Sequence, residues 1–237
     1  MKPDDELDAV ERRYARRASQ IPASRYSPLQ PDVWQTLQER QRALMSLFQQ
    51  QGVGDLGPLQ VTEVGCGSGG NLLELLRLGC DPARLQGIEL LPARHAQARQ
   101  VLPLATRLWL GDACDAQRAP IAAASQDLVL QSTVFSSLLD DAFQQRLAHT
   151  MWAWLKPGGA VLWYDFTVDN PRNPDVRSVP LRRVRQLFPE ATLTTRRVTL
   201  VPPLARMLCS WHPGLYRWAN AVPLLRTHVL AWIAKSD

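Results

Sequence analysis

The sequence has no apolar run long enough to cross a bilayer and only four cysteines in 237 residues. The longest late apolar run, residues 229–234, is far shorter than the roughly 20 residues that a membrane helix needs. The cysteines show no C-x-x-C pair and no metal-ligand spacing with the four histidines, which argues against a zinc ribbon or a disulfide framework. The acidic N-terminus has no apolar segment behind it, so we expect a cytoplasmic protein with no signal peptide and no bound metal.

Acidic residues are scarce in the C-terminal third. From Phe166 onward there are eleven basic residues against four acidic ones, a local net charge of +7 in a chain whose total is +5. Such a surface favours an anionic acceptor, a nucleic acid or a membrane face, and a solvated arginine-rich surface explains it equally well. The 46% hydrophobic and 21% charged fractions are typical of a globular protein.

Glycines are concentrated in one stretch, residues 61–71, around which the chain is organised. Residues 59–64 form an apolar run typical of a buried strand, and leucines at helical spacing follow the glycines. The order strand, glycine turn, helix directs helix N-terminal amides toward a ligand and lets the backbone approach it closely. A nucleotide-like cofactor is the expected ligand.

The spacing of Gly65, Gly67 and Gly70 also satisfies the G-x-G-x-x-G dinucleotide fingerprint. However, Glu63 precedes the first glycine by two residues, and an acid there suits a cationic ligand with an amino group better than a pyrophosphate. No basic residue lies in the turn to hold phosphates. The pattern from Glu63 to Gly69 resembles the first motif of the class I S-adenosylmethionine-dependent methyltransferases.

Further motifs follow in the same order as in that family. Glu89 ends the second predicted strand, 24 positions after Gly65, where a carboxylate accepts from two ribose hydroxyls; NAD-dependent dehydrogenases share this device. The triplet Gly111-Asp112-Ala113 after the third strand is similar to the adenine-contacting motif of the family. A helix over residues 140–154 ends in Lys156-Pro157-Gly158-Gly159 before a strand over residues 160–166, as in the family.

The resemblance implies a Rossmann-like α/β three-layer sandwich. Its sheet is seven-stranded and mostly parallel, and its last strand, residues 227–235, is antiparallel. We expect residues 1–52 to form a helical N-terminal extension or lid and residues 53–237 to form the methyltransferase domain, with residues 202–226 as a cap insertion. The expected cofactor is S-adenosylmethionine, released as S-adenosylhomocysteine. Its expected contacts are Glu63, Gly65, Cys66, Gly67, Gly69, Asn71, Glu89, Leu90, Asp112, Ala113, Gln131 and Ser132.

Methyl transfer mainly requires alignment and exclusion of water, but a hydroxyl or carboxyl acceptor can need a base. Asp165 is the first candidate by its position after the fifth strand, and His149 and His212 follow. The sequence Gln131-Ser132-Thr133-Val134 lacks the acid or Asn and the Pro-Pro-aromatic motif typical of enzymes that methylate exocyclic amines of DNA bases. We therefore expect no DNA substrate.

Candidate acceptor contacts are Arg25, Tyr26, Thr133, Tyr164, Arg172, Arg177 and Arg206. The favoured acceptor is a small anionic molecule that is methylated on oxygen, such as a sugar, a glycan precursor or an acidic metabolite. Structured RNA is the second candidate, with less support because no RNA-binding module is appended. Residues 202–226 are interpreted as an acceptor cap, a peripheral membrane contact, or packing against the core or a second subunit in a homodimer. An NAD-dependent oxidoreductase and a non-catalytic cofactor-binding protein stay open as alternatives.

Overall fold

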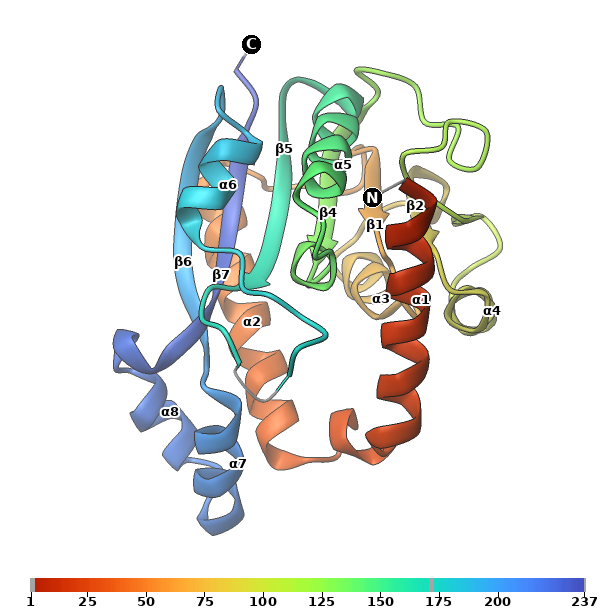
Figure 1. Ribbon diagram of the computed structural model, residues 1–237. Helices are drawn as coiled ribbons and strands as arrows, with labels where there is room; N and C mark the ends of the chain where they lie inside the picture. The colour runs from red at the N-terminus through yellow and green to blue at the C-terminus, as the bar shows by residue number, and fades with distance from the viewer. Residues whose placement is uncertain (1–2, 171–172, 237) are drawn as a thin grey trace.

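The computed structural model describes residues 3–170 and 173–236. A seven-stranded sheet crosses the molecule in the order β3-β2-β1-β4-β5-β7-β6 (Figure 1). The strands β1 to β5 pair in parallel, and β7 is antiparallel to β5 and β6. The strands are β1 (Val61–Val64), β2 (Leu85–Glu89), β3 (Arg107–Leu110), β4 (Gln126–Ser132), β5 (Leu155–Phe166), β6 (Thr192–Leu200) and β7 (Arg226–Ala234). The predicted Rossmann-like sheet is confirmed.

The central strands β1 and β2 are buried along their whole length. Parallel strands covered on both faces are expected to be almost entirely apolar, because helices pack on either side. Thr62, Glu63, Gln86 and Glu89 depart from this pattern, and each is at most 9% exposed. Buried polar groups need partners, so these exceptions mark the part of the sheet with specific chemistry.

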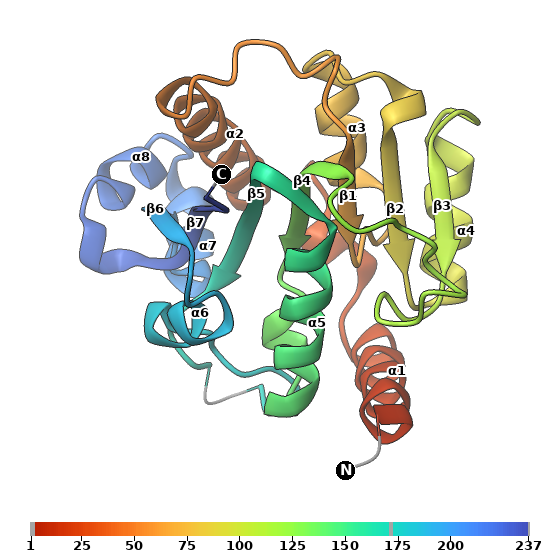
Figure 2. The ribbon, with the colours of Figure 1, turned by 90° about the horizontal axis from the view of Figure 1, so that it is seen from above.

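Helices cover both faces of the sheet (Figure 2). The helices α5 (Asp141–Trp154) and α6 (Leu181–Leu187) pack on one face, together with α1 (Pro3–Gln20). On the other face lie α2 (Pro31–Gln50), α3 (Gly70–Arg77) and α4 (Pro92–Val101). Short 3-10 helices occur at η1 (Ala23–Tyr26), η2 (Pro82–Arg84), η3 (Phe135–Ser137) and η4 (Pro223–Leu225).

The start of α5 illustrates how the sequence sets an element boundary. Asp140 precedes the first helical residue, and its Oδ1 accepts from the Phe143 N–H at 2.7 Å, which satisfies an amide that has no partner within the helix. Phe143, Leu147 and Met151 then recur at helical spacing, and each is at most 4% exposed. The cap and the apolar face therefore position the loop between β4 and α5 at the C-terminal end of the sheet.

The beginning of β5 corrects one predicted boundary. The sequence predicted a turn over residues 155–159 and a strand from Ala160, whereas β5 begins at Leu155. Leu155 pairs with Gln126 and Ala160 with Leu128, so the register shifts and the intervening residues bulge out of the ladder. Gly158 lies within this irregular stretch with φ +73°. The change of chain direction after α5 therefore occurs within β5, at a bulge near its start.

The segment between β6 and β7 forms α7 (Pro202–Trp211) and α8 (Leu215–Asn220). A small core of its own contains Leu200, Ala205, Cys209 and Tyr216, all at most 5% exposed. Figure 1 shows α7 and η1 toward the end of the sheet where the arrowheads of β4 and β5 lie. Among the described residues no helix combines the length and hydropathy required to cross a membrane.

Candidate functional site

The glycine turn after β1 adopts backbone conformations that other residues rarely reach. Gly65 has φ +64°, and a Cβ placed on it would lie 2.5 Å from Cγ2 of Val134. Gly67 has φ +57°, but a Cβ there would meet nothing within 4 Å. Gly65 is thus required by packing, whereas Gly67 leaves its side of the turn open. That open side allows close approach of a ligand to the backbone.

Glu89 joins the end of β2 to this turn. Its Oε2 accepts from the Gly67 N–H and its Oε1 from the Leu91 N–H, both at 2.8 Å. Glu89 is only 4% exposed. A carboxylate offers about four lone-pair positions, so Glu89 retains the capacity to accept two further hydrogen bonds.

Glu63 lies in the middle of a second polar group beneath the turn. Its Oε1 accepts from Asn71 Nδ2 at 2.6 Å, whereas Oε2 is buried and has no partner. Burial raises the pKa of Glu63 to about 7, and the hydrogen bond from Asn71 and the charge of Arg40 oppose this shift. A buried carboxylate oxygen without a donor is costly unless a donor or a cation reaches it.

Arg40 of α2 completes this group, and sequence reasoning missed it. Its guanidinium donates to Asn71 Oδ1 at 2.8 Å, lies 3.6 Å from Glu74 Oε2, and stacks over the Tyr164 ring at 5.2 Å. Arg40 and Asn71 are 31 residues apart. No pattern in the sequence links the two residues, because the sequence around Arg40 is that of an amphipathic helix packed on a sheet.

Asp112 lies after β3, and its two oxygens face different partners. Its Oδ1 accepts from the Cys114 N–H at 2.9 Å, and its Oδ2 lies 3.6 Å from Arg146 of α5. The former contact makes a tight turn that holds Ala113 at the end of the strand. The Asp112 turn follows the end of β3, and Glu89 is the last residue of β2, as predicted, whereas Glu63 lies within β1, one residue before its end.

The exit of β4 is constrained by hydrogen bonds. Gln131 is 2% exposed; its Nε2 donates to the Tyr164 carbonyl at 3.3 Å and its Oε1 accepts from the Val134 N–H at 3.1 Å. Thr133 follows with φ +58°, an unusual conformation for a β-branched residue. Both functional ends of the Gln131 amide are occupied, so this side chain shapes the loop. Ser132 and Thr133 are half-buried beside it.

Asp165, the first candidate base, is buried completely. Its Oδ2 accepts from the Ser136 N–H at 3.1 Å and its Oδ1 from the Phe166 N–H at 2.9 Å. Burial raises the pKa of Asp165 to about 7. Strand alternation directs it to the face of α5, opposite to Tyr164. In this arrangement Asp165 supports the loop after β4, and a catalytic role stays a prediction.

The two candidate histidines are exposed and lie apart from the glycine turn. His149 is on α5, where its Nε2 lies 3.1 Å from Gln145 Nε2. His212 follows α7, and its Nδ1 accepts from the Gly214 N–H at 3.0 Å. Neither histidine has a described partner that would direct it toward the ends of β1 and β4.

The candidate acceptor contacts lie in several environments. Tyr26 is exposed and its hydroxyl accepts from Arg17 at 3.1 Å, with Arg25 exposed beside it. Tyr164 donates to or accepts from Thr199 Oγ1 at 2.8 Å. The remaining candidates are arginines: Arg177 pairs with Asp141, Arg206 is half-buried on α7, and Arg172 lies outside the described residues.

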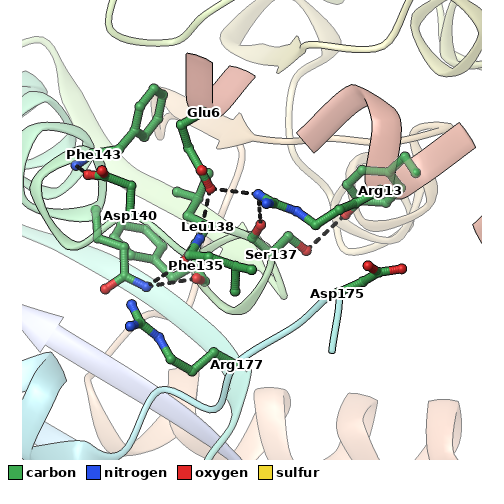
Figure 3. Close-up of polar contacts among 12 residues, drawn as sticks. Glu6, Arg13, Phe135, Ser137, Leu138, Asp140, Phe143, Asp175 and Arg177 are labelled. Atoms are coloured by element: carbon green, nitrogen blue, oxygen red, sulfur yellow. Dashed lines mark hydrogen bonds and ion pairs between the residues drawn. The ribbon is translucent and has the colours of Figure 1, made fainter. Parts of the chain in front are cut away.

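Hydrogen bonds hold helix α1 against the loop after β4 (Figure 3). Glu6, which is 1% exposed, accepts from the Leu139 N–H at 2.8 Å and from Arg13 at 2.6 Å. Arg13 also donates to the Ser137 carbonyl at 3.0 Å. On the other side of α1, the guanidinium of Arg94 from α4 lies over the ring of Tyr14, with its carbon 4.5 Å from the ring centroid. The helix therefore bridges the elements that follow β4 and β2.

A second buried network, also missed from the sequence, lies under α2. The carboxylate of Glu39 accepts from the Thr199 N–H at 2.9 and 3.0 Å and from the Tyr216 hydroxyl at 2.8 Å. Thr199 has φ +65°. A lone acid on the apolar side of the α2 pattern was the available signal, but its partners are 160 and 177 residues away.

The arrangement suits an organic cofactor. Across residues 3–170 and 173–236, no group of three or more His, Cys, Asp and Glu side chains could hold a metal ion. Parallel strands, a glycine turn and carboxylates at the strand ends define a Rossmann-like site for a nucleoside-containing cofactor.

Comparison with known proteins narrows this class. Residues 61–159 match the family described as "Methyltransferase domain". A search of curated proteins finds no match. Among solved structures, the chain is similar to a 1,6-didemethyltoxoflavin N1-methyltransferase from Burkholderia thailandensis, crystallised with S-adenosylhomocysteine. The two are 17% identical with a TM-score of 0.66, over 100% of this chain and 92% of that one.

Two further structures cover nearly the whole chain. A possible histamine N-methyltransferase from Thermotoga maritima is 14% identical, with a TM-score of 0.59 over 97% of this chain and 100% of that one. A putative methyltransferase in complex with the Trm112 activator, from Haloferax volcanii, is 16% identical, with a TM-score of 0.58 over 98% and 97%. At these identities the structures support the fold.

The matched family, together with this fold, decides between the cofactor classes that the glycine pattern left open. The family match over residues 61–159 and the seven-stranded fold support a class I S-adenosylmethionine-dependent methyltransferase. It is an enzyme whose cofactor is S-adenosylmethionine.

Proposed function

We propose that the cofactor lies across the ends of β1, β2 and β3, held by Glu63, Glu89, Asp112 and the turn from Gly65 to Gly69. The observation that favours this placement is the buried, unpartnered Oε2 of Glu63, which the ammonium of a methionine moiety would satisfy. The free lone pairs of Glu89 suit two ribose hydroxyls, and Asp112 suits an adenine amino group. The adjoining contacts would come from Cys66, Asn71, Leu90, Ala113, Gln131 and Ser132.

We infer an acceptor that is a small molecule with an anionic oxygen, such as a carboxylate or an acidic hydroxyl. When bound, the cofactor supplies a methyl group on a positively charged sulfur, which an anionic oxygen attacks without prior deprotonation. The carboxylate of Asp165 is fully buried and holds two amides, and His149 and His212 are exposed elsewhere. An acceptor that already carries its charge removes the requirement for a side-chain base.

Arginines that form no ion pair in the described part of the chain support the negative charge of this acceptor. Arg17 lies in the last turn of α1, Arg25 in η1 and Arg206 on α7. Figure 1 shows η1 and α7 toward the end of the sheet where the arrowheads of β4 and β5 lie. Within the described part of the chain, none of the three forms an ion pair. Such guanidinium groups attract an anion and orient it through paired N–H donors.

We further propose that residues 1–52 act as a lid over residues 53–237, and that residues 202–226 cap the acceptor side. The bonds from Glu6 and Arg13 to the loop after β4 support the lid. Closing this side would exclude water from the methyl group, which is the main requirement of the reaction. A cytoplasmic location stays a prediction.

The test is methyl transfer from radiolabelled S-adenosylmethionine to a panel of small carboxylates, acidic hydroxyls, neutral hydroxyls and amines. We expect turnover with the first two groups, and Asp165→Asn should retain turnover within about threefold because no base is lost. Labelling of amines alone would overturn the oxygen assignment. Loss of turnover in Asp165→Asn, with unchanged S-adenosylhomocysteine affinity and melting temperature, would overturn base-free transfer. Labelled RNA in place of a small acceptor would favour the second substrate class, which the net charge of +5 supports.

A further inference from the structure

A cavity of about 480 Å³ opens between α2, β6 and α8, and its size is that of a small-molecule site. Its lining comes from segments that are far apart in the sequence, and β6 is the edge strand of the sheet. Five arginines line the cavity: Arg42, Arg196, Arg197, Arg217 and Arg226.

Glu39 is the acidic residue among the described residues that line the cavity, and its carboxylate accepts hydrogen bonds from neutral donors. It accepts from the Thr199 N–H at 2.9 Å and the Tyr216 hydroxyl at 2.8 Å. Residues 191–236 contain no Asp or Glu at all. Glu39 keeps its negative charge because its donors are neutral, so five arginines and one carboxylate leave the lining with a net charge of +4.

The contacts that these arginines do make are with neutral acceptors. Arg196 donates to Gln50 Oε1 at 2.9 Å, and Arg226 donates to the backbone carbonyls of Asn220 at 2.7 Å and Arg197 at 3.0 Å. The guanidinium groups of Arg42, Arg197 and Arg217 have no hydrogen-bond or ion-pair partner within residues 3–170 and 173–236. Some arginines elsewhere have an acidic partner; for example, Arg13 pairs with Glu6.

Positive charges gathered around one cavity repel each other, and a bound anion turns this repulsion into attraction. Guanidinium groups bind phosphate through two parallel N–H···O bonds, whereas a single carboxylate cannot satisfy several of them. Arg226 donates to two backbone carbonyls, so its guanidinium group is already oriented before a ligand arrives. The charge and the geometry together favour a ligand with several negative charges.

The cavity is separate from the proposed cofactor site. Three strand-to-strand steps, each about 4.8 Å, place β6 roughly 14 Å from β4, the nearest strand with proposed cofactor contacts. This distance is too long for direct methyl transfer to a group held among the arginines. We propose that the cavity is a second ligand site that binds a multiply charged phosphate group.

The phosphate group has two chemical sources, a soluble phosphorylated metabolite or an anionic lipid headgroup. Trp211 and Trp218 are both 80% exposed, and Leu224 is 86% exposed. Trp218 belongs to α8, which also contributes Arg217 to the cavity. Exposed tryptophans beside arginines are typical of a membrane-surface contact, so the experiment includes both sources.

The first measurement is the melting temperature of the whole protein with increasing pyrophosphate, compared with sodium chloride at equal ionic strength. We expect wild type to gain about 3 °C or more at roughly 10 mM pyrophosphate, because a ligand that binds only the folded state stabilises it. Arg197→Ala/Arg217→Ala should lose this gain, since both side chains are exposed and unpartnered and their removal should not disturb the fold. Arg182→Ala/Arg185→Ala, on exposed positions of α6, is the matched control and should keep it.

The second measurement is sedimentation with phosphatidylglycerol or phosphatidylcholine vesicles. Retention on phosphatidylglycerol alone, lost in Arg197→Ala/Arg217→Ala and displaced by pyrophosphate, identifies a lipid headgroup; a pyrophosphate effect without retention identifies a soluble ligand. No gain in wild type, or an equal gain in Arg197→Ala/Arg217→Ala, overturns the site. Stabilisation by S-adenosylhomocysteine, measured in parallel, should be the same in all three proteins. Its loss would count against the cofactor assignment and would leave the pyrophosphate result intact.

Discussion

Asn71 Nδ2 lies 2.6 Å from Glu63 Oε1, and this hydrogen bond leaves the other carboxylate oxygen of Glu63 buried without a donor. Asn71 belongs to the first turn of α3, and Glu63 lies in β1. The contact therefore links the strand to the helix on either side of the glycine turn. It also aligns a carboxylate whose negative charge is only partly compensated by the protein itself.

Glu63→Gln should weaken S-adenosylhomocysteine binding on the order of ten- to a hundredfold, because it removes the charge that would pair with the methionine ammonium. The amide keeps the bond with Asn71 and does not introduce a buried charge, so stability at pH 8 should be equal or higher. Calorimetric titration and urea unfolding measure the two effects. Undiminished affinity would contradict the proposed role of Glu63.

Glu89→Ala should lower cofactor affinity by about tenfold or more and also destabilise the protein, since the Gly67 and Leu91 amides each lose an acceptor at 2.8 Å. Thermal shift with saturating S-adenosylhomocysteine and titration calorimetry provide the measurement. The exposed Glu190→Ala is the control for removal of one negative charge. Equal affinities in wild type and Glu89→Ala would remove the ribose assignment.

The ligand-free protein should show a pH dependence of stability that originates partly from Glu63. Its pKa is about 7 in the folded protein, above the roughly 4.3 of an unfolded chain. The folded state therefore binds the proton more tightly, and this contribution is present at low pH and lost as the pH rises from about 4 to about 7. Asp165, with a pKa of about 7, acts in the same direction.

His228 opposes this trend at the acid end, because burial lowers its pKa to about 4 and its neutral form is favoured in the folded state. The clean readout is therefore a comparison of variants. Between pH 5 and pH 8, Glu63→Gln should gain stability relative to wild type, on the order of 1–3 kcal/mol. Urea unfolding at both pH values measures this gain. A constant difference between the two proteins would contradict the raised pKa.

Arg13→Ala should loosen α1 by removing donors to Glu6 and to the Ser137 carbonyl. If α1 is a lid, S-adenosylhomocysteine should dissociate about fivefold faster or more, the change expected for the loss of ~1 kcal/mol. Stopped-flow tryptophan fluorescence measures the rate. Arg12→Ala, an exposed neighbour on the same helix, is the control. Equal dissociation rates in Arg13→Ala and Arg12→Ala would exclude the lid.

Much of the cofactor side of the fold could be predicted, because each signal there is local. The glycine turn, Glu89 and Asp112 follow strands in chain order, and parallel strands bring their C-terminal ends to one edge of the sheet. The roles of these residues stay predictions, but their proximity did not require knowledge of long-range contacts. The start of β5 was predicted less well, because a bulge in the register is set by the partner strand.

By itself the sequence determined the order of strands and helices, the glycine conformations and the placement of acids at strand ends, since these depend on neighbouring residues along the chain. Tertiary structure alone decided that Asp165 faces the interior, that Arg40 meets Glu74 and Asn71, and that arginines of α2, β6 and α8 surround one cavity. Such contacts join side chains separated by tens to hundreds of residues. These contacts are determined by how the helices and strands pack, and the conformational propensities of neighbouring residues do not specify them.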